Sequence, residues 1–299
     1  MTDDVIAKKL EGLYLALGPF LEAIQLTPAF SGAPDESIVA DFFAGNPQEP
    51  ALPGFVEALQ KWSVPQNKDW FAYKLSDPAA QRMAAESLTA ETGVAIEAED
   101  VALTRGAFGA LTTVLQAITD TGDEVIFLSP PWFFYEAMIL FAGAAPVRVK
   151  IDRSTFDIDL AVVERAITPR TRAIIVNTPN NPTGRIYPPE TLSRLAEILE
   201  EGSRQNARPI YLVSDESYSR ILFNGNKFHS PGLYYPKTFL IHTYSKSALS
   251  PGQRLGYVAL PAEMPGREQI RQALLTMALV GGSDCPMPSC NTRSETSTP

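Results

Sequence analysis

The middle of the chain alternates short apolar segments typical of strands with longer segments typical of helices. Apolar runs cover Glu124–Leu128, Arg172–Val176 and Ile210–Val213, and the stretch Pro189–Gln205 has the apolar spacing of an amphipathic helix. Strand–helix–strand units of this length usually join parallel strands and place helices on both faces of the sheet. The pattern therefore predicts an α/β fold of three αβα layers around a mainly parallel sheet.

The alternation continues on both sides of this region, and no internal repeat interrupts it. The further predicted strands are Asp100–Thr104, Pro146–Ile151, Thr238–His242 and Leu255–Leu260, and the further predicted helices are Ala107–Ile118 and Trp132–Phe141.

Small, aromatic or polar residues follow five of the predicted strands. They are Gly106, Trp132, Asn181, Asp215 and Thr243. In sheets of this kind, ligands bind outside the carboxyl ends of the strands. The sequence therefore predicts that five separate segments meet at one edge of the sheet and form a binding site there.

Composition bounds the class of protein. With 299 residues and 45% hydrophobic content, the chain can bury the core of one large domain or of one and a half. Its net charge of −9, without a long basic run, argues against nucleic acid or an anionic membrane as a partner. The acidic start Met1–Asp4 is unlike a secretory signal, and no segment reaches the roughly 18 apolar residues of a membrane span, so we expect a cytoplasmic location.

Cysteines and histidines give no sign of a metal centre. The two cysteines, Cys285 and Cys290, lie near the end of the chain, which excludes a disulfide framework for its body. His229 and His242 have no partner at a metal-binding spacing, and a structural role is expected for both.

The most informative motif is Thr243-Tyr244-Ser245-Lys246. A single lysine is by default a surface side chain, but Lys246 belongs to an ordered set of motifs. The set comprises Gly252-Gln253-Arg254 downstream and, upstream, Thr104-Arg105-Gly106-Ala107-Phe108, Pro130-Pro131-Trp132, Asn180-Asn181-Pro182-Thr183-Gly184 and Asp215-Glu216-Ser217-Tyr218.

In these motifs, from about Phe43 to Pro261, the chain resembles the class I/II aminotransferases, the aspartate-aminotransferase-like enzymes of fold type I that use pyridoxal 5'-phosphate (PLP). The resemblance implies transfer of an amino group between an L-amino acid and a 2-oxo acid. A PLP-dependent lyase or synthase of the same fold shares every motif, so it stays an alternative. A truncated PLP-binding module with little turnover is a further alternative.

The resemblance assigns roles around the cofactor ring. Lys246 would form a Schiff base with the PLP aldehyde and later move a proton at the substrate Cα. Asp215 would pair with the pyridine nitrogen and keep it protonated, while Asn181 and Tyr218 would hydrogen-bond the phenolic oxygen. Trp132 would lie flat on the ring.

Simpler interpretations of two of these residues remain open at this point. Asp215 could cap a helix that begins at Glu216, because aspartate is a favoured N-cap residue. Trp132 could be a core aromatic at the start of the helix Trp132–Phe141.

The resemblance also assigns groups to the phosphate. Free N–H groups and the dipole at a helix start favour an anion, and an arginine can pair with two phosphate oxygens. Phe108 stands where the family often has a small or polar residue, although its backbone amide can still serve. The proposed ligands are the amides of Gly106, Ala107 and Phe108, the hydroxyls of Thr243 and Ser245, and the guanidinium of Arg254.

Two N-terminal features fit the resemblance less specifically. Tyr73 matches a tyrosine that reaches the phosphate of the neighbouring subunit, which implies a homodimer, although a core tyrosine is equally compatible with the sequence. Gly45-Asn46-Pro47 is similar to the family's Gly-x-Pro near the substrate carboxylate.

The resemblance stops between Pro261 and Val280, before the small C-terminal domain that carries an arginine for the substrate α-carboxylate. Neither Arg271 nor Arg293 has the matching context. We expect an N-terminal arm and part of a small domain in 1–50, a PLP-binding large domain in 51–280 and a disordered tail in 281–299. The corresponding hypothesis is a truncated aminotransferase that binds PLP but transaminates poorly, because the carboxylate anchor is absent.

Overall fold

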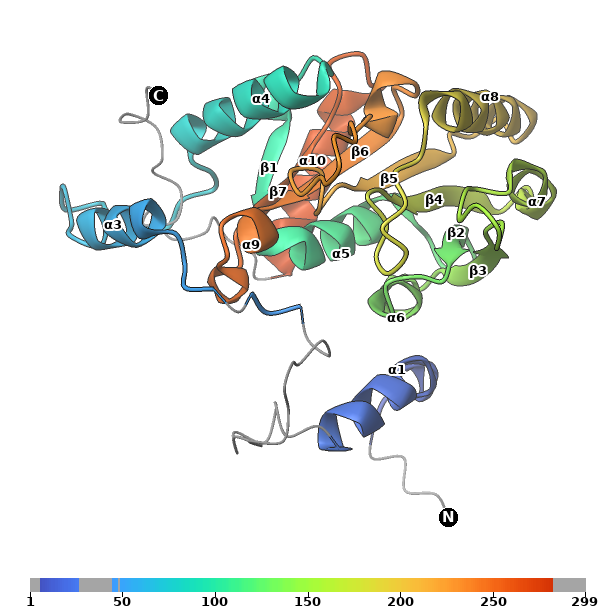
Figure 1. Ribbon diagram of the computed structural model, residues 1–299, viewed down its shortest axis with the longest axis horizontal. Helices are drawn as coiled ribbons and strands as arrows, with labels where there is room; N and C mark the ends of the chain where they lie inside the picture. Colours follow the sequence, from blue (N-terminus) through green and yellow to red (C-terminus); the bar gives the residue numbers. More distant parts are fainter. Residues whose placement is uncertain (1–5, 27–44, 48, 282–299) are drawn as a thin grey trace.

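The structure is a computed structural model that describes residues 6–26, 45–47 and 49–281 (Figure 1). The predictions that concern Phe43, Cys285, Cys290, Arg293 and the tail from residue 282 onward lie outside the described residues.

A seven-stranded sheet in the order β1-β7-β6-β5-β4-β2-β3 forms the centre of the described chain. The neighbours from β6 to β3 all pair in parallel, whereas β7 runs antiparallel to both β6 and β1. This arrangement confirms the predicted mainly parallel sheet. The strands are β1 (Val101–Thr104), β2 (Glu124–Ser129), β3 (Ala145–Lys150), β4 (Thr171–Asn177), β5 (Tyr211–Asp215), β6 (Thr238–Thr243) and β7 (Gly256–Ala259).

Side chains alternate between the two faces of the sheet and build a core on each side. In β2, Val125 and Phe127 face one core, and Ile126 and Leu128 face the other, as the period of two in a strand requires. Helices cover both faces, which confirms the three-layer α/β fold (Figure 1). One face carries α5 (Gly106–Ile118), α6 (Phe134–Phe141) and α10 (Arg267–Val280), and the other carries α4 (Pro78–Thr92), α7 (Leu160–Ala166) and α8 (Pro189–Gln205).

The helix α8 has the bounds that its sequence pattern predicts. Pro189 opens it, where a missing N–H costs no hydrogen bond. Leu192, Leu195 and Leu199 recur on one face and are buried against the sheet, while the opposite face is charged. Strong periodicity and a clear start signal together explain why the sequence predicts this helix so well.

Most predicted boundaries differ from the observed ones by one or two residues, and two of these differences bear on the site. The first strand begins at Val101 rather than Asp100, because Asp100 ends a short 3₁₀ turn, η1 (Ala98–Asp100), and its carboxylate binds Arg267. The helix predicted from Trp132 begins at Phe134, so Trp132 lies in the loop that follows β2. Pro131 disfavours helical backbone at Pro130, so the chain is still in a loop just before Trp132.

Five of the longer helices in the described part of the chain have no counterpart among the predicted elements. The helix α1 packs against α6, where Phe20 stacks on Phe133 with ring centroids 4.4 Å apart; Figure 1 draws α1 below the sheet. Beyond the main layers lie α3 (Pro53–Trp62) and three short elements that follow strands or turns. The unanticipated helices are α1 (Lys9–Leu26), α3, α4, α7 and α10, and the short elements are η2 (Pro231–Leu233), α9 (Tyr244–Ser247) and η3 (Pro251–Gln253).

Gly256 occupies the tightest point of the sheet and gives a first prediction. A Cβ at this residue would lie 2.5 Å from the carbonyl oxygen of His242 and 2.8 Å from the backbone of Gly106. Both neighbours are backbone atoms, so Gly256→Ala is expected to cost about 1–3 kcal/mol of folding free energy, as overpacking does. Thermal unfolding measures the cost.

Gly252→Ala is the matched control, because no described atom lies within 4 Å of the Cβ it would add. We expect its melting temperature to equal that of the unmodified chain. A Gly256→Ala chain that also melts at that temperature would show that the strand ends can move apart without cost.

Candidate active site

The carboxyl ends of β4, β5 and β6 bring Asn177, Asp215 and Thr243 to one edge of the sheet. Gly256, the first residue of the antiparallel β7, pairs with both Thr104 and Thr243, so β7 begins at this same edge. The loop before β7 is therefore held beside the ends of β1 and β6. This geometry agrees with the prediction that separate segments meet at one edge.

Asp215 is buried, and both of its carboxylate oxygens accept hydrogen bonds. Tyr135 donates its hydroxyl to Oδ2 over 2.6 Å, and Ser217 donates its hydroxyl and its backbone N–H to Oδ1 over 2.6 Å and 3.2 Å. Burial raises the pKa of Asp215 above its ordinary value, and the bonds from Ser217 and Tyr135 oppose that rise. Those bonds favour the charged form of a buried carboxylate.

No helix begins at Glu216, so the alternative that Asp215 is the N-cap residue of such a helix is wrong. Residues 217–220 form a turn, and the carboxylate caps this turn instead. Glu216 points elsewhere: it accepts bonds from Ser230 and contacts His242 at 2.8 Å in the buried interior. Asp215 and Glu216 are therefore adjacent in sequence but contact different sets of side chains.

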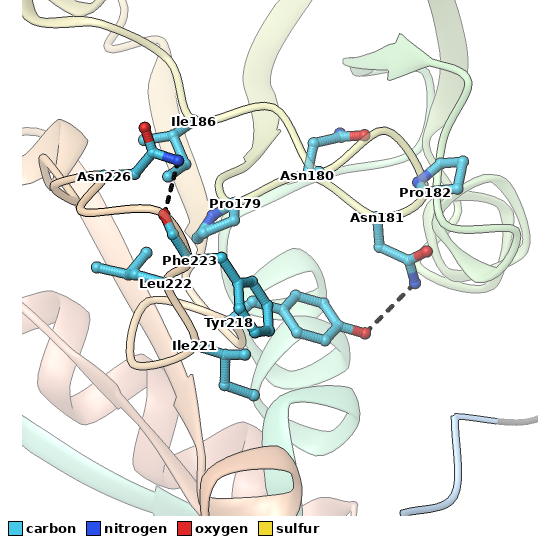
Figure 2. A pocket seen from close by; sticks show the side chains of 11 residues that line it. Pro179, Asn180, Asn181, Pro182, Ile186, Tyr218, Ile221, Leu222, Phe223 and Asn226 are labelled. Atoms are coloured by element: carbon cyan, nitrogen blue, oxygen red, sulfur yellow. Dashed lines mark hydrogen bonds between the residues drawn. The ribbon is translucent and has the colours of Figure 1, made fainter.

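Asn177 connects Asp215 to the next loop. Its side chain donates to the carbonyl of Asp215 over 2.9 Å and accepts from the backbone N–H of Asn181 over 2.6 Å. Asn181 in turn points its amide toward the Tyr218 hydroxyl, 3.5 Å away, as Figure 2 shows. Burial raises the pKa of Tyr218, the charge of Asp215 raises it further, and Asn181 opposes the rise.

Lys246 lies on the short helix α9, which Thr243 caps by accepting the N–H of Ser245. Its amine donates to the carbonyl of Gly45 over 2.8 Å, and a Cβ on Gly45 would lie 2.6 Å from the amine nitrogen. Burial lowers the pKa of Lys246 below its ordinary value, and the positive charge of Arg254 lowers it further. The neutral, nucleophilic amine is thereby favoured.

A second cluster at the edge suits an anion. Gly106 has a positive φ of 70°, and a Cβ there would lie 3.2 Å from the Arg254 guanidinium and 3.7 Å from the Thr243 hydroxyl. The side chain of Arg105, at the N-cap of α5, makes no capping bond to the first turn that Gly106 and Ala107 begin. Free amide hydrogens, a guanidinium and a hydroxyl around one small space form an anion-binding cradle.

The remaining members of the predicted phosphate set differ in position. Ser245 is buried, and its hydroxyl lies 2.8 Å from that of Thr243. Phe108 turns its side chain away from the cradle, because its ring meets those of Trp132 and Phe134 edge-on at 5.8 Å and 5.1 Å.

Trp132 lies beside the site rather than inside a helix. Its ring meets that of Tyr135 edge-on, with centroids 5.5 Å apart, and it is only partly buried. The helix start assumed by the simpler alternative is therefore wrong, although Trp132 does pack against the core cluster. Tyr73 is 97% exposed, which excludes the alternative of a core tyrosine for that residue.

The sequence analysis missed three polar residues of this edge. Tyr135 and Ser217 hold the carboxylate of Asp215, and Asn177 joins its backbone to Asn181. Asn177 is a polar residue at the end of an apolar strand, which is a usable signal. Tyr135 carries no such signal, because it lies in an aromatic run that reads as core.

A cavity of about 420 Å³ opens beside Asn181 and Tyr218 (Figure 2). The loops 179–186 and 221–226 form its walls, with Ile186, Leu222 and Phe223 among the apolar side chains. No charged side chain lines it among the described residues.

The described residues hold no helix that is long and apolar enough to cross a membrane, and no group of three or more histidine, cysteine or acidic side chains placed to bind a metal ion.

The fold of this chain matches the folds of solved aminotransferases. A solved aminotransferase from Eubacterium rectale matches 96% of this chain and 73% of its own, with a TM-score of 0.84 and 30% identity. Aspartate aminotransferase from Thermus thermophilus with maleate matches 96% and 71%, with a TM-score of 0.77 and 31% identity.

The family model described as aminotransferase class I and II matches residues 37–284, and the chain belongs to that family. The aspartate/prephenate aminotransferase of Thermus thermophilus is 39% identical over 214 residues, which are 71% of this chain and 54% of that protein. The arginine–pyruvate transaminase of Pseudomonas aeruginosa is 35% identical over 190 residues, 62% of this chain and 47% of that protein. The chain thus spans about half the length of these curated relatives.

Proposed function

We propose that this chain is a PLP-dependent aminotransferase that moves an amino group between an L-amino acid and a 2-oxo acid. One observation carries the proposal: a desolvated lysine, a buried carboxylate and an anion cradle lie at the same edge of the sheet. Membership of the aminotransferase family supports the same conclusion.

The residues of the edge fit PLP group by group. Lys246 would hold the aldehyde carbon, and Asp215 would face the ring nitrogen. Asn181 and Tyr218 would hold the phenolic oxygen, and Trp132 would cover one face of the ring. The phosphate would lie among the amides of Gly106, Ala107 and Phe108, the hydroxyls of Thr243 and Ser245, and the guanidinium of Arg254.

When bound, PLP supplies an electron sink that stabilises negative charge at the substrate Cα. The chain's own residues then divide the remaining work. Lys246 Nζ would hold the aldehyde carbon, and its amine would carry a proton to or from the substrate Cα. The bonds from Tyr135 and Ser217 favour the charged form of Asp215, which would hold a proton on the ring nitrogen.

Domain organisation and location are part of the proposal. We assign residues 51–280 to a PLP-binding large domain, residues 1–50 to an arm with part of a small domain, and residues 281–299 to a tail outside both. A cytoplasmic location fits a chain with two cysteines in 299 residues.

Tyr73 is proposed to reach the phosphate of a second copy in a homodimer. Because Tyr73 is 97% exposed, Tyr73→Phe is expected to leave the melting temperature of the cofactor-free chain unchanged. Loss of one hydrogen bond to a charged phosphate should weaken PLP binding about tenfold. Thermal unfolding measures the melting temperature, and absorbance titration with PLP measures the affinity. Sedimentation equilibrium measures whether the chain is a dimer.

The matched control is Tyr14→Phe, an exposed tyrosine on α1. It should bind PLP as the unmodified chain does. A Tyr73→Phe chain with unchanged affinity, or a chain that binds PLP fully as a monomer, would contradict the role assigned to Tyr73.

The substrate-carboxylate anchor is not supplied by Arg271. Its guanidinium binds Asp100 at 3.2 Å, just before the start of β1 and therefore at the end of the sheet opposite the site.

Two other functions share the same cofactor site. A PLP-dependent lyase or synthase would release ammonia and pyruvate, whereas an aminotransferase yields a 2-oxo acid and an aminated acceptor. A PLP-binding module would hold the cofactor without turning over any amino acid.

The deciding experiment has two stages. The purified chain is loaded with PLP, freed of excess and examined for a visible absorbance band, and it is then incubated with amino acids and a 2-oxo acid. An aminated acceptor supports the proposal. A chain that retains no PLP would overturn it.

A further inference from the structure

Tyr135 links two groups that the proposed function places around the cofactor ring. It lies in the first turn of α6, yet its hydroxyl reaches the end of β5 and donates to Asp215 Oδ2 over 2.6 Å. Both residues are almost fully buried, at 3% and 5% exposure. A hydrogen bond from a hydroxyl to a carboxylate in such surroundings is short and strong.

The same residue contacts Trp132 in two ways. The two rings meet edge-on, at 79° and 5.5 Å between centroids, and the backbone N–H of Tyr135 donates to the carbonyl of Trp132 over 3.2 Å. Edge-to-face pairing and a backbone bond together limit how the indole can turn. One side chain therefore connects the loop after β2 to the end of β5.

The hydrogen bonds of Asp215 show what Tyr135 contributes. Ser217 supplies both donors that Oδ1 receives, from the same turn as Asp215 itself. Tyr135 is the donor to Oδ2 from a distant element, 80 residues away in the sequence. Ser217 alone would hold only Oδ1 of the carboxylate. The donor from Tyr135 also holds Oδ2, and two held oxygens fix the plane of the carboxylate.

We propose that Tyr135 is a positioning residue of the cofactor site, which orients the Asp215 carboxylate toward the ring nitrogen of PLP and the Trp132 indole toward the ring face. The inference rests on the proposed function. It adds a residue that would touch neither substrate nor cofactor and acts through the two that do.

The electrostatics of the pair agree with this role. Burial raises the pKa of Asp215, and the hydroxyl of Tyr135 is one of the two side-chain donors that oppose the rise. Without that donor, the pKa of Asp215 is higher, and the charged carboxylate that would keep the ring nitrogen protonated is less favoured. The effect of removing the hydroxyl should therefore depend on the presence of the ring nitrogen.

The test compares Tyr135→Phe with the matched control Tyr187→Phe. Tyr187 is also fully buried, and its hydroxyl has no hydrogen-bond partner among the described residues. Each chain is titrated with PLP and with 1-deazapyridoxal 5'-phosphate, in which a CH group replaces the ring nitrogen. Melting temperatures of the cofactor-free chains are recorded in parallel.

We expect Tyr135→Phe to bind PLP about tenfold more weakly than the unmodified chain and to bind the deaza analogue with much less loss. Tyr187→Phe should bind both compounds as the unmodified chain does. In an Asp215→Asn background, Tyr135→Phe should cause no further loss of PLP affinity, because the charged acceptor is already gone.

Equal losses for PLP and the deaza analogue would overturn the inference, since they would indicate a merely structural role. Unchanged PLP binding by Tyr135→Phe would overturn it as well. Failure of the unmodified chain to bind PLP would instead overturn the proposed function, and the inference with it. If Tyr135→Phe does not fold, Tyr135→His, which keeps a buried N–H donor, must restore the preference for PLP over the analogue.

Discussion

Lys246→Ala is expected to abolish the visible absorbance band that the unmodified chain keeps after PLP is added and the excess removed. The amine of Lys246 is the group that would bind the aldehyde carbon. Burial and the charge of Arg254 lower the pKa of this amine, which favours its reactive neutral form. Alanine leaves the anion cradle and Asp215 in place, so weak binding of free PLP should persist. Absorbance spectra before and after desalting measure both effects.

Lys150→Ala is the matched control for this experiment. Lys150 is an exposed residue at the end of β3, separated from β6 by three other strands of the sheet. The control should keep the band in full. If Lys246→Ala also kept it, another amine would hold the cofactor, and the role given to Lys246 would be wrong.

Arg254→Ala is expected to weaken PLP binding about a hundredfold, which corresponds to roughly 3 kcal/mol, while leaving the weaker binding of pyridoxal nearly unchanged. The guanidinium lies beside Gly106 and Thr243, where it can pair with two phosphate oxygens. Pyridoxal has the same ring and aldehyde but no phosphate. Titration of each chain with both compounds separates loss of the phosphate contact from general damage to the site.

Two further variants refine this result. Arg254→Lys keeps the charge but not the planar pair of donors, so we expect an affinity between those of the unmodified chain and Arg254→Ala. Arg153→Ala, at an exposed residue after β3, should bind PLP normally. Equal weakening of PLP and pyridoxal by Arg254→Ala would contradict phosphate binding and indicate a structural role for Arg254.

The sequence predicts the strands of the sheet and the edge at which their carboxyl ends lie, because both depend on local patterns. The helix α8 has its predicted bounds, and the apolar runs in the middle of the chain form β2, β4 and β5. The first 50 residues show the limit of such patterns. In α1 a glycine and a proline interrupt the apolar spacing, and the helix packs against the distant α6.

Sequence motifs name individual residues of the candidate site, but they do not predict the contacts between those residues. Motifs place Asp215 at a strand end, yet nothing local indicates that Tyr135, 80 residues earlier, donates to it. Phe108 illustrates the same point in reverse. It opens the helix beside the anion cradle, but its side chain joins the aromatic cluster of Trp132 because ring contacts outweigh its position in the motif.

The antiparallel strand β7 has a consequence for how the protein acquires its site during synthesis. It pairs on one side with β6, its neighbour in sequence, and on the other with β1, which leaves the ribosome much earlier. Contacts between such distant segments form slowly and late. The cradle that joins Gly106 to Arg254 can therefore close only after β7 has been inserted. Phosphate binding at this edge would thus mark the moment at which a newly made chain has completed its sheet.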